Sequence, residues 1–142
     1  MTDAEDQHWR IGAYAICRRG DEVLVVRASA RTTVEGRWFL PGGGIRFGEP
    51  PDVAVLRELF EETGLTGHDP RIVGVTSDLH DREDGGRYFV VRLLFEVVVD
   101  DGVLVAEAEG TSDAARWVPM DEVRALGAIP YVLRALGLDA EK

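Results

Sequence analysis

Three glutamates, Glu58, Glu61 and Glu62, lie within five residues of the chain, directly after Arg57. In a helix, which turns about 100° per residue, their side chains fall within about 100° of one another. Like charges at these spacings repel by a few tenths of a kcal/mol per pair, whereas Mg²⁺ binds proteins through a few such carboxylates. The cluster therefore indicates either a divalent-cation site or a charged surface helix in which Arg57 and Glu61 form one ion pair.

Glycines precede this cluster, as a run from Gly42 to Gly44 and again at Gly48. Glycine lets the backbone adopt positive φ and approach a ligand closely, and the amide groups at the start of a following helix can bind an anion. A tight turn is the alternative explanation for such a run. In either case we expect Pro41 to Gly44 to be a loop, because proline and glycine weaken both helices and strands.

A helix is expected over residues 51–63, since prolines and an acid at 50–52 suit its first turn and Gly64 suits its left-handed end. The apolar stripe of this helix lies about 100° to 200° from Glu58. It consists of Leu56, Leu59, Phe60 and Thr63. If this stripe packs against a sheet, the three glutamates point together to the opposite side.

Strands are expected before and after this helix. A hairpin is predicted from two apolar runs around a Gly-Asp turn, at 9–19 and 22–28. Further strands are expected at 71–79, 87–99, 103–106 and 115–118, and short helices at 119–126 and 130–136. This order predicts an α/β fold with a mixed sheet flanked by helices.

The chain has 142 residues, and no linker or repeat divides it, so a single domain over 1–142 is expected, with residues 1–8 as a flexible N-terminal segment. The lone Cys17 can neither close an internal disulfide nor build a cysteine-rich metal site, and its apolar neighbours predict a buried thiol.

Charge and hydropathy restrict the partners. There are 16 basic and 26 acidic residues, which gives a net charge of −10, and no basic stripe exists to bind a nucleic-acid polymer. No apolar run reaches the roughly 20 residues of a membrane helix, and the acidic N-terminus is no targeting signal, so a cytoplasmic protein is expected. A small phosphorylated ligand remains compatible with the acidity, because a metal ion can bring it to the surface. Whether the chain forms a homodimer is left open.

Residues 43–65 read GGIRFGEPPDVAVLRELFEETGL. This segment resembles the signature of the Nudix hydrolase family (MutT-like), in which a glycine, a glutamate, an Arg-Glu pair and a Glu-Glu pair stand at fixed spacing. The matching positions are Gly43, Glu49, Arg57, Glu58, Leu59, Glu61, Glu62, Gly64 and Leu65. The resemblance implies the Nudix fold, an α/β/α sandwich around a mixed β-sheet.

The resemblance also implies hydrolysis, dependent on Mg²⁺ or Mn²⁺, of a nucleoside diphosphate linked to another group. The metal ligands implied are Glu58, Glu61 and Glu62, with the carbonyl of Gly42 as a further one. Either Glu58 or Glu61, or an acid from a later loop, would activate the attacking water. Arg57 and Glu49 would form an ion pair that braces the loop against the helix. This chemistry is physically consistent, because a diphosphate resists attack until cations neutralise its oxygens.

Other residues are candidates for substrate contacts. Arg46 stands where many members of the family carry an acid, and it is expected either to contact substrate phosphate or to face solvent. Arg27 and Arg37 flank the glycine run and could meet phosphate, with surface ion pairs as the alternative. Glu107 and Glu109 lie in the region from which the family often supplies a further acid, although a polar loop would carry acids anyway.

Several functions compete within this resemblance. A small nucleotide substrate is expected, and the short chain favours a nucleoside triphosphate over ADP-ribose or another nucleotide sugar. A non-catalytic nucleotide-sensing module is a further alternative, disfavoured by the complete glutamate cluster. An isomerase acting on an isoprenoid diphosphate would need a cysteine near the site, and Cys17 is far from the motif in sequence.

Overall fold

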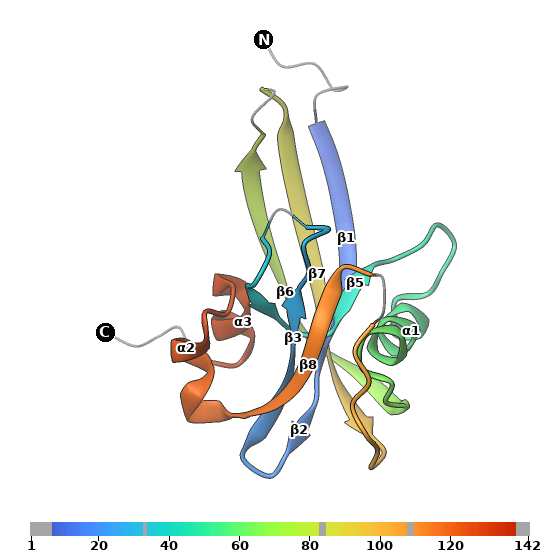
Figure 1. Cartoon of the computed structure of the whole chain (residues 1–142). Coiled ribbons are helices and arrows are strands. Elements are labelled where there is room, and N and C mark those ends of the chain that lie inside the picture. The colour runs from blue at the N-terminus through green and yellow to red at the C-terminus, as the bar shows by residue number, and fades with distance from the viewer. Residues whose placement is uncertain (1–6, 33, 83–84, 108–109, 139–142) are drawn as a thin grey trace.

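The computed structural model describes residues 7–32, 34–82, 85–107 and 110–138 (Figure 1). The strands are β1 (Gln7–Ile16), β2 (Arg18–Arg19), β3 (Glu22–Ala28), β4 (Trp38–Phe39), β5 (Gly42–Gly44), β6 (Gly67–Asp81), β7 (Arg87–Val99) and β8 (Ser112–Pro119). The helices are α1 (Pro51–Thr63), the 3₁₀ turn η2 (Met120–Glu122), α2 (Val123–Leu126) and α3 (Pro130–Ala135). Within the described ranges, no helix is long and apolar enough to span a membrane.

The strands form two sheets of four. The first has the order β5-β1-β7-β6, in which β1 and β7 are parallel and the other pairs antiparallel. In the second, which is wholly antiparallel, β3 pairs with β2, β4 and β8. Helix α1 lies on one side of the sheets and α2 with α3 on the other (Figure 1). The expected α/β/α sandwich with a mixed sheet is confirmed, with its strands divided between two sheets.

Alternate residues of β1 supply two separate cores, because successive side chains of a strand point to opposite faces. Ala13 and Ala15 pack into the cluster that includes the buried face of α1. Tyr14 and Ile16 pack into the cluster that includes α2 and α3. Cys17 is fully buried, as expected, and burial raises the pKa of its thiol to about 12, so it is neither a reactive nor an acid-base group at neutral pH.

The predicted hairpin of 9–19 with 22–28 is wrong for most of its length. Residues of β1 pair with β7 from Gln7↔Arg87 to Ile16↔Glu96, and only the two-residue β2 pairs with β3. The Gly-Asp turn does close a hairpin, but a very short one. The residues of the long parallel partner lie eighty positions further along the chain, and turn signals carry no information about such a distant strand.

Two further expectations are corrected. Residues 103–106 form no strand; Val103 and Val105 are exposed, and the Val105 amide donates to the Thr63 carbonyl at the end of α1. The glycine run is not a loop, since Gly42–Gly44 forms the edge strand β5 against β1. A Cβ at Gly42 would lie 2.3 Å from the Ala13 carbonyl oxygen, so glycine is required here by the close approach of two strands.

Helix α1 has the expected bounds and ends at Gly64, with φ 79°. Its buried face differs from the predicted stripe. The buried residues are Ala54, Val55, Leu59, Glu62 and Thr63, whereas Phe60 is 58% exposed. With Glu58 as zero, this buried arc runs from about −40° to about 140° and is centred near Glu62. The glutamates therefore do not lie opposite the core: Glu62 lies within the buried arc, because it contacts a backbone amide of β5.

This corrected orientation can be tested by truncating two neighbouring residues of α1. Leu59→Ala is expected to lower the free energy of unfolding by about 2–5 kcal/mol, because the side chain is fully buried. Phe60→Ala is the matched control and is expected to cost under about 1 kcal/mol despite the larger deletion. Urea unfolding followed by circular dichroism measures both. A larger loss of unfolding free energy for Phe60→Ala than for Leu59→Ala would contradict the corrected orientation and favour the predicted stripe, in which Phe60 is buried.

Candidate active site

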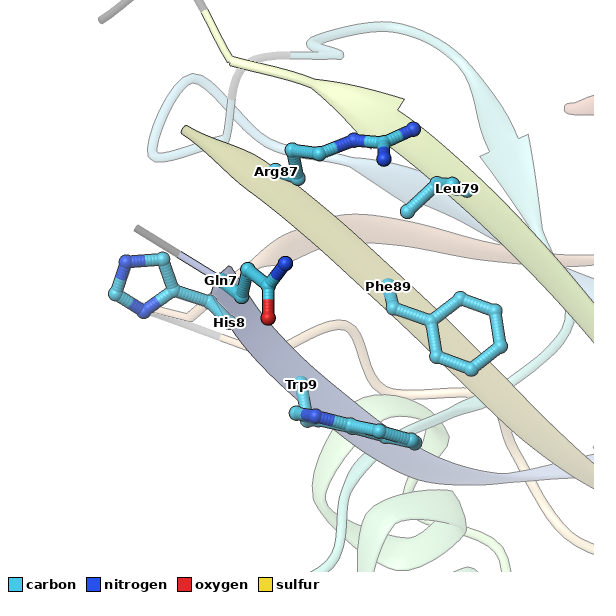
Figure 2. Close-up of a pocket in the computed structure, with 6 residues that line it drawn as sticks. All are labelled: Gln7, His8, Trp9, Leu79, Arg87 and Phe89. Carbon is cyan, nitrogen blue, oxygen red and sulfur yellow. The ribbon is translucent and has the colours of Figure 1, made fainter. Parts of the chain in front are cut away.

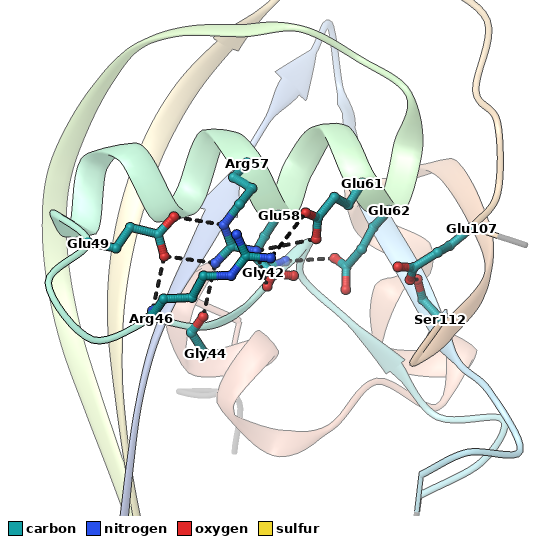
Figure 3. Close-up of polar contacts among 10 residues, drawn as sticks. All are labelled: Gly42, Gly44, Arg46, Glu49, Arg57, Glu58, Glu61, Glu62, Glu107 and Ser112. Carbon is teal, nitrogen blue, oxygen red and sulfur yellow. Dashed lines mark hydrogen bonds and ion pairs between the residues drawn. The ribbon is translucent and has the colours of Figure 1, made fainter. Parts of the chain in front are cut away.

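Arg57, in the middle of α1, binds both the loop and the strand that precede the helix (Figure 3). Its Nε lies 2.7 Å from Glu49 Oε2 and its Nη2 lies 2.8 Å from Glu49 Oε1, so the pair is bidentate. The same Nη2 donates to the carbonyl of Gly44 at 3.2 Å. The ion pair expected between Arg57 and Glu49 is thus present. It fixes the loop between β5 and α1 against the helix.

The guanidinium determines the charge of Glu49. Hydrogen bonds from Arg57, then one from the Arg46 amide, lower the pKa of Glu49 from 4.5 to about 2. The pKa of Arg57 is raised in turn, chiefly by Glu49. Because the pKa of Glu49 is depressed by folding, the pair stabilises the native state above pH 4.5 and loses that contribution as the pH falls towards 2.

Arg57 also contacts two of the clustered glutamates. Its Nη1 lies 3.0 Å from Glu58 Oε1 and 3.3 Å from Glu61 Oε1. Arg46 approaches the cluster from the exposed side, with its Nη2 3.9 Å from Glu61 Oε2. Arg46 was expected either to contact substrate phosphate or to face solvent. Its side chain is 67% exposed, yet it stands beside a carboxylate of the cluster.

Glu62 is the most enclosed member of the cluster, with 4% of its surface exposed. Its Oε1 accepts a hydrogen bond of 2.8 Å from the Gly42 amide. Burial raises the pKa of Glu62 well above its ordinary value; the Gly42 amide opposes this rise, and the charges of Glu58, Glu107 and Glu61 add to it. A buried carboxylate is therefore fixed against the glycine strand by one backbone donor.

Glu58 packs against the next glycine. A Cβ at Gly43 would lie 2.8 Å from the carboxyl carbon and from Oε2 of Glu58, so only glycine leaves room for the carboxylate. Burial raises the pKa of Glu58, the Arg57 contacts lower it, and repulsion from Glu61 and Glu107 raises it again. The motif glycines and glutamates are thus fitted to one another by contact.

Glu107 is brought to this cluster from the far end of the chain, and its Oε1 lies 3.3 Å from Ser112 Oγ (Figure 3). Sequence spacing alone did not separate it from Glu109, which lies outside the described residues. A hollow of about 290 Å³ adjoins Glu107. It is lined by Ser29, Ala30, Arg31, Glu107, Gly110, Ser112 and Asp113.

The carboxylates suit a hard divalent cation, because they supply only oxygen donors and because the charges of Glu61 and Glu107 raise the pKa values of Glu58 and Glu62. They are not gathered as a finished metal centre: among the residues described, no group of three acidic, histidine or cysteine side chains has that arrangement. Arg57 Nη1 occupies Oε1 of both Glu58 and Glu61. A cation would compete with this contact, while Glu49 continues to hold the rest of the guanidinium.

Arg27 and Arg37 have structural partners away from the glutamates. Arg27 Nε lies 2.7 Å from Asp113 Oδ1, which is the surface ion pair weighed as the alternative. Arg37 donates from Nε to the Gly127 carbonyl at 3.0 Å and from Nη2 to the Ala128 carbonyl at 3.2 Å. It therefore satisfies carbonyls at the end of α2.

A second hollow lies at the opposite end of the first sheet (Figure 2). It is lined by Gln7, His8, Trp9, Leu79, Arg87 and Phe89. Its volume of about 120 Å³ is small beside the roughly 300–1,000 Å³ of typical ligand pockets. Its lining also contains no carboxylate, so the glutamate cluster is the stronger candidate site.

Comparisons with known proteins identify the family of the chain. The NUDIX domain family matches residues 6–135. The MutT-like protein of Streptomyces ambofaciens is 31% identical over 124 residues, which are 87% of this chain and 72% of that protein. Diphosphoinositol polyphosphate phosphohydrolase 3-alpha of Mus musculus is 41% identical over 73 residues, or 51% of this chain and 43% of that one. An RNA pyrophosphohydrolase of Yersinia pestis is 46% identical over 76 residues, 54% and 41% of the two chains. The chain thus spans less than half the length of these last two relatives.

Solved structures share the fold. A NUDIX hydrolase from Nitrosomonas europaea superimposes with a TM-score of 0.74 at 24% identity, over 90% of this chain and 86% of that one. A MutT protein from Bacillus halodurans gives a TM-score of 0.68 at 26% identity, over 84% and 74% of the two chains.

The charge of Glu49 provides a direct test of the brace. In a ¹³C NMR pH titration, the Glu49 side-chain carboxyl is expected to titrate near pH 2, and in Arg57→Gln its midpoint should rise towards 4.5 because both the fork and its charge are gone. Arg27→Gln is the control: Arg27 pairs with Asp113, so its substitution should leave the Glu49 midpoint unchanged. A midpoint near 4.5 in the unaltered protein would contradict the ion pair.

Proposed function

The chain belongs to the NUDIX domain family, and from this premise we propose that it is a pyrophosphohydrolase that cleaves a phosphoanhydride bond with the help of Mg²⁺ or Mn²⁺. The proposed substrate is a nucleoside diphosphate linked to another group, foremost a nucleoside triphosphate. The observation that carries the proposal is the convergence of Glu58, Glu61 and Glu62 on a glycine strand with which two of them are in contact.

The residues that would hold the cation are Glu58, Glu61, Glu62 and the Gly42 carbonyl. Support for the carbonyl comes from strand geometry, since a strand residue points its amide and its carbonyl to the same side. The Gly42 amide points at Glu62, away from β1, so its carbonyl faces the same free edge of β5. When bound, the cation would neutralise diphosphate oxygens and lower the pKa of a bound water.

Glu58 is our first choice for the group that takes a proton from the attacking water. Its Oε1 accepts from Arg57, which leaves Oε2 free to receive a proton. Burial already raises the pKa of this carboxyl towards the range in which a general base works well. Glu61 and Glu107 are the alternatives. Glu62 is less suited, because its Oε1 is engaged by the Gly42 amide in a nearly closed environment.

Arg57 and Glu49 are assigned to support. The guanidinium joins the loop carboxylate, the Gly44 carbonyl and two glutamates of the helix, so it determines how the glycine strand and the acidic face lie relative to each other. A displacement of about 1 Å in such a site can cost roughly 10²-fold in rate.

The proposed reaction class, hydrolysis of a phosphoanhydride, includes several possible substrates. The relatives act on different phosphoanhydrides by name, on diphosphoinositol polyphosphates and on RNA. The net charge of −10 favours a small nucleotide over a nucleic-acid polymer. ADP-ribose or another nucleotide sugar is the alternative to a triphosphate, and non-catalytic nucleotide sensing is disfavoured because a sensor need not keep the full set of glutamates. We propose a cytoplasmic location, while the choice between monomer and homodimer depends on measurement.

A panel of nucleotides assayed for phosphate and monophosphate release tests the proposal. Hydrolysis is expected with Mg²⁺ or Mn²⁺ and should stop in excess chelator. Glu62→Gln should lower kcat more than tenfold, since it removes a ligand charge but keeps an oxygen that can accept from the Gly42 amide. Glu35→Gln, at an exposed position, is the control. Full turnover in chelator, or more than about a tenth of kcat retained in Glu62→Gln, would reject the assignment.

The supporting role of the brace predicts non-additive kinetics. Arg57→Ala and Glu49→Ala are each expected to lower kcat with little change in Mn²⁺ affinity, because both release the same loop. The double variant should then be no slower than the slower single variant. A double-mutant cycle on kcat, with Mn²⁺ titrations alongside, measures this. Additive losses, or a large fall in Mn²⁺ affinity for Arg57→Ala, would mean that the two residues act separately.

A further inference from the structure

Strand β5 has a second face, turned away from Glu58. A Cβ at Gly43 would meet the Glu58 carboxylate at 2.8 Å, whereas a Cβ at Gly44 would lie 3.7 Å from Nη2 of Arg10, a residue of the neighbouring β1. Successive strand residues point to opposite faces, so the carboxylates and this guanidinium lie on the two sides of one thin glycine strand. Figure 1 shows β5 beside β1 at the edge of its sheet.

Two tyrosines lie next to Arg10. The Tyr14 ring, from the same strand, folds over Gly12 on the face that carries Arg10, with its hydroxyl 3.2 Å from where a Cβ of Gly12 would lie. Tyr88 of β7 pairs with His8, two residues before Arg10, and both hydroxyls interact electrostatically with the guanidinium. The Tyr14 ring can lie here because its neighbour is Gly12: a Cβ at Gly12 would be 2.7 Å from Tyr14 Cε1. Gly12 thus leaves room for the tyrosine, while Gly44, its partner in β5, lies within ordinary contact distance of the arginine.

Arg10 differs in its charge balance from several other arginines of the chain. Arg27, Arg57 and Arg92 each pair with a carboxylate. No carboxylate partner of Arg10 is found among the residues the structure describes, although acids outnumber bases in the chain by 26 to 16. Arg10, an exposed residue that no carboxylate of the described ranges pairs with, therefore stands next to the strand that carries the glycines of the candidate site.

The chemistry of the group is that of an anion site. A guanidinium has five N–H donors and no acceptor, and each tyrosine oxygen that accepts from it keeps its own O–H to donate elsewhere. The three side chains therefore offer donors only. A phosphate matches this set because it has only acceptors and suits the forked guanidinium, whereas a nucleobase edge mixes donors and acceptors.

The two faces of β5 can be reached by one ligand. β5 is an edge strand, so a ligand can lie across its free side, where the Gly44 carbonyl also meets Arg57. Side chains on the two faces of a strand point in opposite directions, so a ligand that reaches both must pass around this free edge. A phosphate chain or a phosphorylated group that extends beyond the scissile diphosphate has this form.

We propose that Arg10, positioned by the buried Tyr14 and assisted by the partly exposed hydroxyl side chain of Tyr88, forms a subsite for a phosphate group of the substrate beyond the diphosphate held at the glutamates. The assignment to substrate rests on the proposed hydrolase function. It makes Arg10 a specificity-determining residue, one that favours substrates with an additional phosphate over those that end in an uncharged sugar.

Binding without metal tests the anion site by itself. Inorganic tripolyphosphate is titrated with the full-length protein in excess chelator, and its ³¹P line widths are followed. Broadening is expected with the unaltered protein, Arg10→Ala should weaken the apparent affinity about tenfold or more, and Tyr88→Phe should weaken it less. Arg18→Ala, which removes the same charge from another exposed site, should have no effect. Equal binding by Arg10→Ala and the unaltered protein, or no binding by either, would overturn the proposal.

Turnover tests whether the anion is part of the substrate. With Mg²⁺, Arg10→Ala is expected to lower kcat/KM for ATP at least tenfold more than for ADP-ribose, which has the same diphosphate but an uncharged terminal ribose; Arg10→Lys should recover part of the loss. Equal losses for both substrates would overturn the role in specificity. If no nucleotide is hydrolysed while Arg10→Ala still loses tripolyphosphate binding, the hydrolase proposal fails and the anion site stands.

Discussion

The site depends on one guanidinium whose charge is shared among several oxygens. Arg57 is only 17% exposed, and it binds Glu49 through two parallel hydrogen bonds while touching the carbonyl of Gly44 and the carboxylates of Glu58 and Glu61. A cluster of like charges at the end of a helix opposes the helix dipole as well as itself. Arg57 makes the arrangement tolerable without a bound cation, and its bidentate grip on Glu49 remains if a cation displaces it from Glu58 and Glu61.

The glycines of β5 are needed because they lack a side chain, more than because their backbone is flexible. A side chain at Gly42 would strike β1, and one at Gly43 would strike Glu58. The strand is thus a partition without side chains, against which carboxylates pack on one face and Arg10 on the other. A chain of small residues with exposed backbone is a poor strand by propensity. It is stable here because β1 pairs with it and because Glu62 and Arg57 satisfy groups on its free edge.

Local signals predicted the elements that local interactions determine. The bounds of α1 follow from its prolines and from Gly64, and the span of β7 follows from its continuous apolar run. What failed depended on partners distant in the sequence. The buried face of α1 was misjudged because Glu62 was treated as a charge that must avoid the core, whereas the Gly42 amide makes its burial possible. β5 was expected to be a loop for a similar reason, since its partner β1 contributes the pairing that glycine propensity opposes.

The arginines illustrate the same limit for function. Nearness in sequence to the glycine run favoured Arg27 and Arg37, yet in the structure one pairs with Asp113 and the other satisfies carbonyls after α2. Arg10 gave no signal, because its proposed role depends on its neighbours in the fold: no carboxylate of the described residues pairs with it, and one of the two tyrosines beside it lies on a strand about eighty residues away. A guanidinium is available for an anionic ligand only when the folded protein leaves its charge unopposed, so candidates in an acidic domain must be judged by their neighbours in space. Arg10 meets that condition among the described residues. It lies beside Gly44, and the preceding glycine, Gly43, packs against Glu58.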